Sequence, residues 1–222
     1  MCSILLIEFE CKTSRGQVRD LTVSVGPHEL LQMQLPDANN TYLCRHPQRE
    51  ASNTVAHAYI LIGGNLGNRY ANLRSATQAL ERLAGRILAT STVYETEAWG
   101  MEGPAFLNQA LQLETELAPE ALLDIQLQVE RQLGRERDAA AGYQSRTMDI
   151  DLLLFDNAVI GTDRLTVPHP RMAERRFVLV PLADIAANVV HPVTQTSIAT
   201  MLQQCPDTAA VTEWQIPQAD EA

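Results

Sequence analysis

Apolar residues recur with two different periods between Val55 and Pro192, and the change of period predicts the secondary structure. Alternation of apolar and polar residues predicts strands, whereas apolar residues three or four positions apart predict helices. The expected strands are His57–Ile62, Ile87–Thr96, Phe106–Glu116 and Met148–Phe155. The expected helices are Tyr70–Leu83 and a segment that begins near Pro119 and ends at Gly134. The order β-α-β-β-α-β predicts an α+β fold, a ferredoxin-like two-layer sandwich with an antiparallel sheet and helices on one face.

The two ends of the chain follow this pattern less well. Residues 1–54 are polar and rich in turn-forming residues, with a strand or two expected around Gln17–Val25. An accessory extension and a start codon placed too far upstream explain this segment equally well. The tail over 206–222 is acidic and is expected to fray. One folded domain is therefore expected over residues 55–205.

The strand Met148–Phe155 carries two carboxylates inside an apolar run, at Asp149 and Asp151. Side chains alternate across a strand, so both carboxylates project from one face while Ile150 projects from the other. Adjacent negative charges repel each other unless a cation lies between them, and Mg²⁺ binds carboxylate oxygens while sharing substrate phosphates. Taken alone, the pair would more often be the solvated face of an edge strand. Its surroundings favour a metal site.

Arginine surrounds this strand in the sequence. Twelve arginines and no lysine lie between Val55 and Pro192. Eight of them fall near the acidic strand: Arg131, Arg135, Arg137, Arg146, Arg164, Arg171, Arg175 and Arg176. The planar guanidinium binds phosphate oxygens in pairs and stays charged, so the bias favours recognition of a polyphosphate. A codon preference for arginine over lysine accounts for part of the bias, but not for its concentration around the two aspartates.

Composition and charge restrict the possible partners. The chain of 222 residues is 45% hydrophobic and has a formal net charge of −10. Such a negative protein is a poor match for nucleic acid or an anionic membrane, so we expect small-molecule ligands instead. The four cysteines show no Cys-x-x-Cys spacing, which supports neither a zinc site nor a disulfide framework. With no segment that resembles a signal peptide or a membrane span, the cysteine pattern predicts a cytoplasmic protein. We also expect a monomer.

Two glycine-containing segments were candidates for a phosphate site. The turn Gly63–Asn68 lacks the lysine of a Walker loop and the spacing of a dinucleotide fold, so it is expected to be a tight turn. Either Asn65 or Asn68 would then cap the following helix. The loop Asp138–Ser145 has no large apolar anchor and is flanked by arginines, which predicts a mobile lid beside the acidic strand. This combination is typical of phosphoryl transfer.

The few aromatic residues indicate where a flat ligand could stack. Phe106 and Asn108 share a strand face, which places a ring beside an amide that can donate and accept hydrogen bonds. A core phenylalanine and a turn-stabilising asparagine explain the same spacing equally well. Trp99 and Phe177 are further stacking candidates, whereas His169, between two prolines, is by itself more often a structural loop residue.

Five segments occur in the order and spacing of one enzyme family. They are Tyr59-Ile60-Leu61-Ile62-Gly63-Gly64-Asn65-Leu66-Gly67, Phe106-Leu107-Asn108, Gly134-Arg135-x-Arg137, Arg146-Thr147-Met148-Asp149-Ile150-Asp151, and Val167-Pro168-His169-Pro170-Arg171-Met172 through Arg175-Arg176-Phe177-Val178-Leu179. Over about Val55–Pro192 the chain resembles the 6-hydroxymethyl-7,8-dihydropterin pyrophosphokinases of folate biosynthesis. The last two motifs are highly specific in combination.

The resemblance implies transfer of pyrophosphate from ATP to the hydroxymethyl group of the dihydropterin, with release of AMP. It implies that Asp149 and Asp151 bind two Mg²⁺ ions, and that Arg135 and Arg146 neutralise charge on the transferred group. Positions that match ATP-binding residues of the family are Glu130, Arg137, Arg146, Leu152, Arg164, Thr166, His169 and Arg175. Positions that match its pterin-binding residues are Thr96, Trp99, Phe106, Asn108, Phe177 and the lid aromatic Tyr143.

Departures from the family pattern concern loops. Residues frequent in the family are replaced at Gly64, Glu97-Ala98, Asp138 and Gln144-Ser145. These changes bear on loop rigidity and lid motion and leave the acidic strand intact. Two rival functions are a binding module that has lost the reaction and a different two-metal nucleotidyl transferase. Retention of both aspartates and both arginines argues against the first, and absence of a basic groove argues against the second.

Overall fold

Contacts within the chain divide it into two units, Met1–Ser52 and Asn53–Ala222. The computed structural model describes residues 5–12, 18–25, 43–44, 55–98, 103–135 and 145–215. The first unit holds an antiparallel sheet in the order β2-β1-β3, formed by β1 (Leu5–Lys12), β2 (Val18–Val25) and β3 (Leu43–Cys44). Strand β2 lies where a strand was expected. Strand β1 is an addition, and its alternation of Ile7, Phe9 and Cys11 with charged residues is consistent with it.

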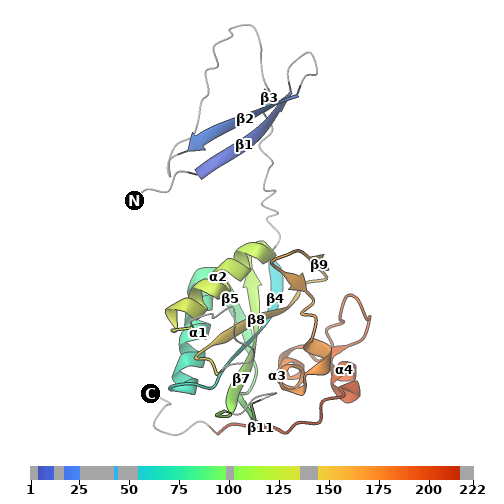
Figure 1. The fold of residues 1–222 in the computed structure, drawn as a ribbon. Coiled ribbons are helices and arrows are strands. Elements are labelled where there is room, and N and C mark those ends of the chain that lie inside the picture. Colours follow the sequence, from blue (N-terminus) through green and yellow to red (C-terminus); the bar gives the residue numbers. More distant parts are fainter. Residues whose placement is uncertain are drawn as a thin grey trace. The chain divides into compact units, whose positions relative to one another are not determined.

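The second unit contains the expected β-α-β-β-α-β succession. Its elements are β4 (Ala56–Gly64), α1 (Arg69–Ala84), β5 (Arg86–Thr90), β6 (Tyr94–Thr96), β7 (Phe106–Thr115), α2 (Pro119–Gln132) and β8 (Asp149–Phe155). With β11 (Val211–Glu213), the strands pair antiparallel in the order β11-β6-β7-β4-β8, and β5 also pairs with β7. The ferredoxin-like antiparallel core is thus confirmed, and the acidic strand β8 lies at one edge of its sheet (Figure 1).

The single strand expected over Ile87–Thr96 is wrong in one respect, because it is broken into β5 and β6. Ser91 lies at the break and bonds twice to Ala110 of β7. Its backbone N–H donates to the Ala110 carbonyl at 2.9 Å, while its hydroxyl accepts from the Ala110 N–H at 2.9 Å. A side chain therefore replaces one partner of the strand ladder, which periodicity does not reveal.

Helices cover both faces of the sheet (Figure 1). On one face, Ile60 and Ile62 of β4 belong to a core shared with α1 and α2. On the other face, Leu61 and Leu153 belong to a core shared with α3 (Arg176–Ala186) and α4 (Ile198–Gln204). The expectation of helices on one face holds for α1 and α2, and the α3–α4 layer is added to it. Pro181 inside α3 weakens the sequence signal for that helix.

The remaining elements follow β8. They are β9 (Ile160–Gly161), β10 (Thr166–Val167), the 3₁₀ turn η1 (Met172–Glu174), α3, α4 and β11. No helix in the described part of the chain is both long enough and apolar enough to cross a membrane.

The expectation of a frayed tail is wrong for Asp207–Trp214. A carboxylate oxygen of Asp207 accepts a hydrogen bond from the Arg176 backbone N–H at 2.9 Å. Strand β11 pairs with β6, and the Trp214 ring lies 5.2 Å from the Tyr70 ring, measured between centroids. These partners lie far away in sequence, so acidic composition alone was misleading. Residues 216–222 lie outside the described ranges.

Candidate active site

The acidic strand β8 places its two aspartates as the alternation predicted. Ile150 and Leu152 are buried in the core shared with α1 and α2, whereas Asp149 and Asp151 remain partly exposed. Asp149 lies opposite Gly63 of β4, and Asp151 lies opposite Leu61. Because Leu61 belongs to the other core, both carboxylates project from the face that carries α3 and α4.

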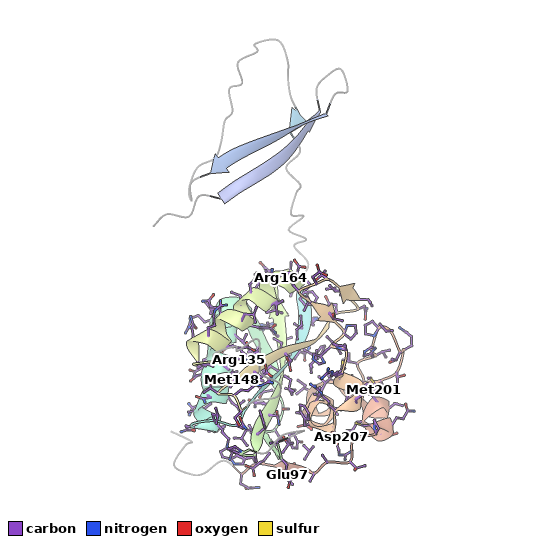
Figure 2. All side chains as sticks on the ribbon, viewed as in Figure 1. Glu97, Arg135, Met148, Arg164, Met201 and Asp207 are labelled. Carbon is purple, nitrogen blue, oxygen red and sulfur yellow. The ribbon has the colours of Figure 1, made fainter. Side chains whose placement is uncertain are left out.

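Two arginines bond to the carboxylate of Asp149. Arg135, just after α2, donates to one carboxylate oxygen of Asp149 and to Glu130, while Arg146 donates to the other oxygen. Glu130 is 1% exposed and also accepts the Ile150 backbone N–H at 2.9 Å, so it caps the free edge of β8. Opposite charges in a partly buried site attract strongly, and this arrangement fixes both guanidinium groups beside the carboxylate. Figure 2 shows Arg135 next to Met148, at the start of the acidic strand.

The second carboxylate, Asp151, is less completely neutralised than Asp149. Burial raises the pKa of Asp151 to about 7, and the negative charges of Asp149 and Glu130 raise it further, while Arg175 and Arg135 partly offset them. A carboxyl group that holds its proton near neutral pH marks a place where positive charge is lacking.

The carboxylates do not form a complete metal cage. Among the described residues, no group of three His, Cys, Asp or Glu side chains is arranged to hold a metal ion. Two carboxylates with substrate oxygens as further ligands are nevertheless the usual protein share of a Mg²⁺ site. The donor set therefore fits an ion that arrives with a phosphate-bearing ligand.

The segment after β10 lies along the outer edge of β8. The His169 backbone N–H donates to the Leu153 carbonyl at 2.9 Å, and its ring Nδ1 accepts from the Arg171 backbone N–H at 3.2 Å. Burial, then the positive charge of Arg175, lowers the pKa of His169, so the ring is neutral with its hydrogen on Nε2. The Arg175 guanidinium lies 5.6 Å from the centre of the Phe177 ring. The structure thus groups His169, Arg175 and Phe177 on the α3 side of β8.

Two predicted nucleotide residues lie farther from the aspartates. Thr166 is exposed on β10, and the exposed Arg164 beside it pairs with Asp124 in the first half of α2. Arg135 follows the other end of that helix, and the rise from Asp124 to the end of α2 is about 12 Å. Arg164 and Arg135 are accordingly well separated in Figure 2.

A second cluster joins β6 and β7. Thr96 lies opposite Phe106, and the Asn108 amide donates to the Thr96 hydroxyl at 2.9 Å. Asn108 is 3% exposed, and Phe106 is partly exposed. The Asn108 side chain lies against Gly63 of β4. A Cβ on Gly63 would be only 2.5 Å from Asn108 Oδ1, so the close approach depends on glycine.

Gly63 connects the two clusters. It lies opposite Asn108 on one side and opposite Asp149 on the other. Directly paired residues share a face, and two strand spacings separate the outer strands by about 10 Å. The cluster around Asn108 and the cluster around Asp149 therefore lie at the same level of one sheet face. Helix α3, which bears Phe177, contacts β7, which bears Phe106.

Several predicted positions cannot be compared with the structure. Trp99, Arg137, Asp138, Tyr143 and Gln144 lie outside the described residues. The predicted lid, Asp138–Ser145, is described only at Ser145.

The glycine turn is a packing feature, as expected. A Cβ on Gly64 would lie 2.3 Å from the Thr147 carbonyl oxygen, so the turn rests against the backbone that carries Arg146. Asn68 caps α1 by accepting the Ala71 backbone N–H at 3.1 Å. Asn65 does not cap the helix and bonds to Arg146 and its neighbours instead. Sequence reasoning missed this role, because both asparagines carry the same capping signal.

Comparison with known proteins shows the family of this chain. Residues 59–187 match the family model described as 7,8-dihydro-6-hydroxymethylpterin-pyrophosphokinase (HPPK). The 2-amino-4-hydroxy-6-hydroxymethyldihydropteridine pyrophosphokinase of Bacillus subtilis (strain 168) is 45% identical over 139 residues, which cover 62% of this chain and 82% of that protein. The enzyme of the same name from Porphyromonas gingivalis is 41% identical over 145 residues, covering 64% of this chain and 98% of that protein.

Solved structures agree in fold. The wild-type Plasmodium falciparum HPPK-DHPS with pterin and p-hydroxybenzoate superposes with a TM-score of 0.55 and 16% identity, over 68% of this chain and 43% of that chain. This chain therefore spans less than half of that longer protein. The family model and the two relatives lead to a single assignment: this chain belongs to the 7,8-dihydro-6-hydroxymethylpterin-pyrophosphokinase family.

Proposed function

We propose a role for each site residue in the reaction of this chain. That reaction transfers pyrophosphate from ATP to the hydroxymethyl group of 6-hydroxymethyl-7,8-dihydropterin. In this reaction the hydroxymethyl oxygen releases its proton to solvent and bonds to the β-phosphorus. The bond between that phosphorus and the oxygen bridging to the α-phosphate breaks, and AMP leaves. The activity is that of the family to which the chain belongs. The observation that carries the residue roles is the pairing of Gly63 with both Asn108 and Asp149.

Asp149 and Asp151 are the proposed ligands of two Mg²⁺ ions. Bound Mg²⁺ would neutralise the triphosphate and hold it in one orientation. Burial and the nearby charges of Asp149 and Glu130 raise the pKa of Asp151, which supports this role because a cation beside that carboxylate would favour its charged form. The carboxylates themselves perform no proton transfer in this proposal.

Arg135 and Arg146 are the proposed charge-stabilising groups. Both guanidiniums already lie beside Asp149, at the end of β8 that faces Gly63. Negative charge moves to the bridging oxygen and the transferred group as the bond breaks, so donors fixed in advance stabilise the transition state without reorganisation. The carboxylate and Glu130 would serve as the scaffold that holds Arg135 for this task.

The outer edge of β8 is the proposed path of the nucleotide. Glu130 bonds to the Ile150 backbone, His169 bonds to the Leu153 backbone, and Arg164 pairs with Asp124 of α2. In this proposal the nucleotide would contact Glu130, Leu152, Thr166, His169, Arg175 and Arg164. A neutral His169 with hydrogen on Nε2 is a donor to an acceptor oxygen or nitrogen of ATP. Arg164 would contact the nucleotide only after leaving or sharing Asp124. Arg137 completes the proposed set.

The cluster on β6 and β7 is the proposed pterin site. Phe106 and Phe177 would stack on the two faces of the ring, and Asn108 would bond to its edge. The remaining proposed pterin contacts are Thr96, Trp99 and Tyr143. Burial of Asn108 supports its role, since an amide fixed by Thr96 discriminates between ligand edges.

The test of this proposal is AMP formation by the full-length chain with ATP, Mg²⁺ and the hydroxymethyl-dihydropterin. We expect one AMP per pterin diphosphate formed, and no AMP when the pterin or Mg²⁺ is omitted. A protein that binds both substrates but forms no AMP would be a binding module instead. We further propose that the enzyme acts as a cytoplasmic monomer on these small molecules, which sedimentation equilibrium and cell fractionation would check.

A further inference from the structure

We infer that Asn65 is a positioning residue that fixes the phosphate side of the site relative to the pterin side. The inference rests on the proposed function, because it takes Arg146 and Phe106 as the residues being positioned. Asn65 is 3% exposed and lies between β4 and α1, in the turn that was expected only to cap a helix.

Asn65 bonds to both backbone polar groups of Arg146, its N–H and its carbonyl. Its own N–H donates to the Arg146 carbonyl at 2.9 Å, and its side-chain oxygen accepts the Arg146 N–H at 2.7 Å. Its amide nitrogen also donates to the Ser145 hydroxyl at 3.1 Å. Backbone bonds of this kind fix where the Arg146 side chain starts, and so fix its approach to Asp149.

The same amide nitrogen reaches the pterin side. It donates a second hydrogen bond, to the Pro104 carbonyl at 3.1 Å. The next carbonyl, that of Ala105, accepts from Arg69 at 2.7 Å, and Arg69 also pairs with Glu95 of β6 at 2.7 Å. Two consecutive carbonyls just before Phe106 are therefore held by side chains from the segment that begins α1.

Asn65 is a positioning residue rather than a ligand-binding one. Both hydrogens of its amide nitrogen and its side-chain oxygen are engaged within the protein. The residue is buried, so its polar groups leave little capacity for a substrate. Removal of the side chain would leave the Pro104 carbonyl and the Arg146 N–H without these partners and let the two sides of the site move independently.

Asn72 provides a matched control. Its amide also ties the glycine turn to the acidic-strand side, donating to the Leu66 carbonyl at 3.1 Å and to the Thr147 carbonyl at 3.4 Å. Neither of these bonds reaches Pro104 or Arg146. Asn72→Ala thus removes an asparagine of α1 that bonds to the same turn, while leaving the link between the two clusters in place.

The experiment compares Asn65→Ala and Asn72→Ala in the full-length protein by steady-state AMP formation, with thermal unfolding as the measure of folding. We expect kcat to fall by at least about tenfold in Asn65→Ala, because small misplacements of a catalytic group cost factors of this size or more. Asn72→Ala should stay within about threefold of wild type. The kcat of the double variant with Arg146→Ala should be little lower than that of Arg146→Ala alone, since Asn65 affects kcat through Arg146.

Three results would overturn the inference. They are a kcat of Asn65→Ala within threefold of wild type, an equal loss in Asn72→Ala, and losses that multiply in the double variant as for an unrelated structural defect. If Asn65→Ala does not fold, Asn65→Asp serves instead. It keeps the acceptor for Arg146 but not the donors, so the pterin KM should rise about tenfold with kcat nearly retained. An unchanged pterin KM in that variant also refutes the inference. Failure of wild type to form AMP would refute the proposed function itself.

Discussion

Replacement of Gly63 by alanine should weaken pterin binding without affecting ATP. The added Cβ would lie 2.5 Å from Asn108 Oδ1 and 3.3 Å from the Leu107 carbonyl, where ordinary contact begins at 3.4 Å. The Asn108 amide must therefore retreat by roughly 0.9 Å, and its bond to Thr96 leaves it no free direction. Loss of one neutral hydrogen bond to the ligand costs about 1 kcal/mol, which corresponds to about fivefold in affinity.

The assay is AMP formation at saturating ATP and varied pterin, beside a thermal melt. We expect the pterin KM to rise about fivefold, the ATP KM to stay unchanged, and the melting temperature to fall by a few degrees through overpacking. Gly161→Ala is the control, because a Cβ on that strand glycine meets nothing within 4 Å. In an Asn108→Ala background the Gly63 substitution should cost much less, since the clashing atom is gone. A folded Gly63→Ala enzyme with a wild-type pterin KM would refute the reasoning.

Four further predictions concern the acidic strand, Arg146 and the unit boundary. Asp149→Ala or Asp151→Ala should abolish turnover in a folded protein, and activity within about tenfold of wild type, or about 1.4 kcal/mol, would exclude the metal role. The pKa of Asp151 is raised to about 7, so without Mg²⁺ its contribution to stability is present at low pH and is lost as pH rises from about 4 to about 7. Asp151→Asn should flatten that decline in melting curves recorded with a chelator, and an unchanged pH profile would contradict the shift. Arg146→Ala should lower kcat more than it raises the ATP KM, with partial rescue by lysine, whereas a normal kcat would make it a plain binding residue. A protein beginning at Asn53, the start of the second unit, should fold and form AMP, and an insoluble or inactive product would assign residues 1–52 to the catalytic domain.

Local patterns in the sequence were enough to predict the core and the acidic strand. The alternation around Asp149 and Asp151, and the helical spacing after Pro119, depend on neighbours within a few residues. The sheet face on which each side chain lies follows from the same periods. The paired arginines could be anticipated because they lie close to the strand in sequence as well as in space.

Other features depend on partners that no local pattern reveals. The break at Ser91 requires Ala110, and the order in the tail requires Arg176 and β6. Asn65 carried a capping signal that Asn68 satisfies, so its links to Pro104 and Arg146 were visible only in three dimensions. Composition was misleading for the tail. The short strand β11 forms because it pairs with the available edge of β6, and composition does not reveal that edge.

The dependence of α3 on Asp207 sets an order for synthesis of the protein. The first backbone N–H of α3 is capped by a residue 31 positions later in the chain, and β6 gains its outer neighbour only when Val211–Glu213 has emerged. During translation, the helix that bears Phe177 and the strand that bears Thr96 therefore exist before the segment that secures them. A nascent chain halted just before Asp207 would carry every proposed substrate contact, yet leave the edge of β6 open to pairing with another chain.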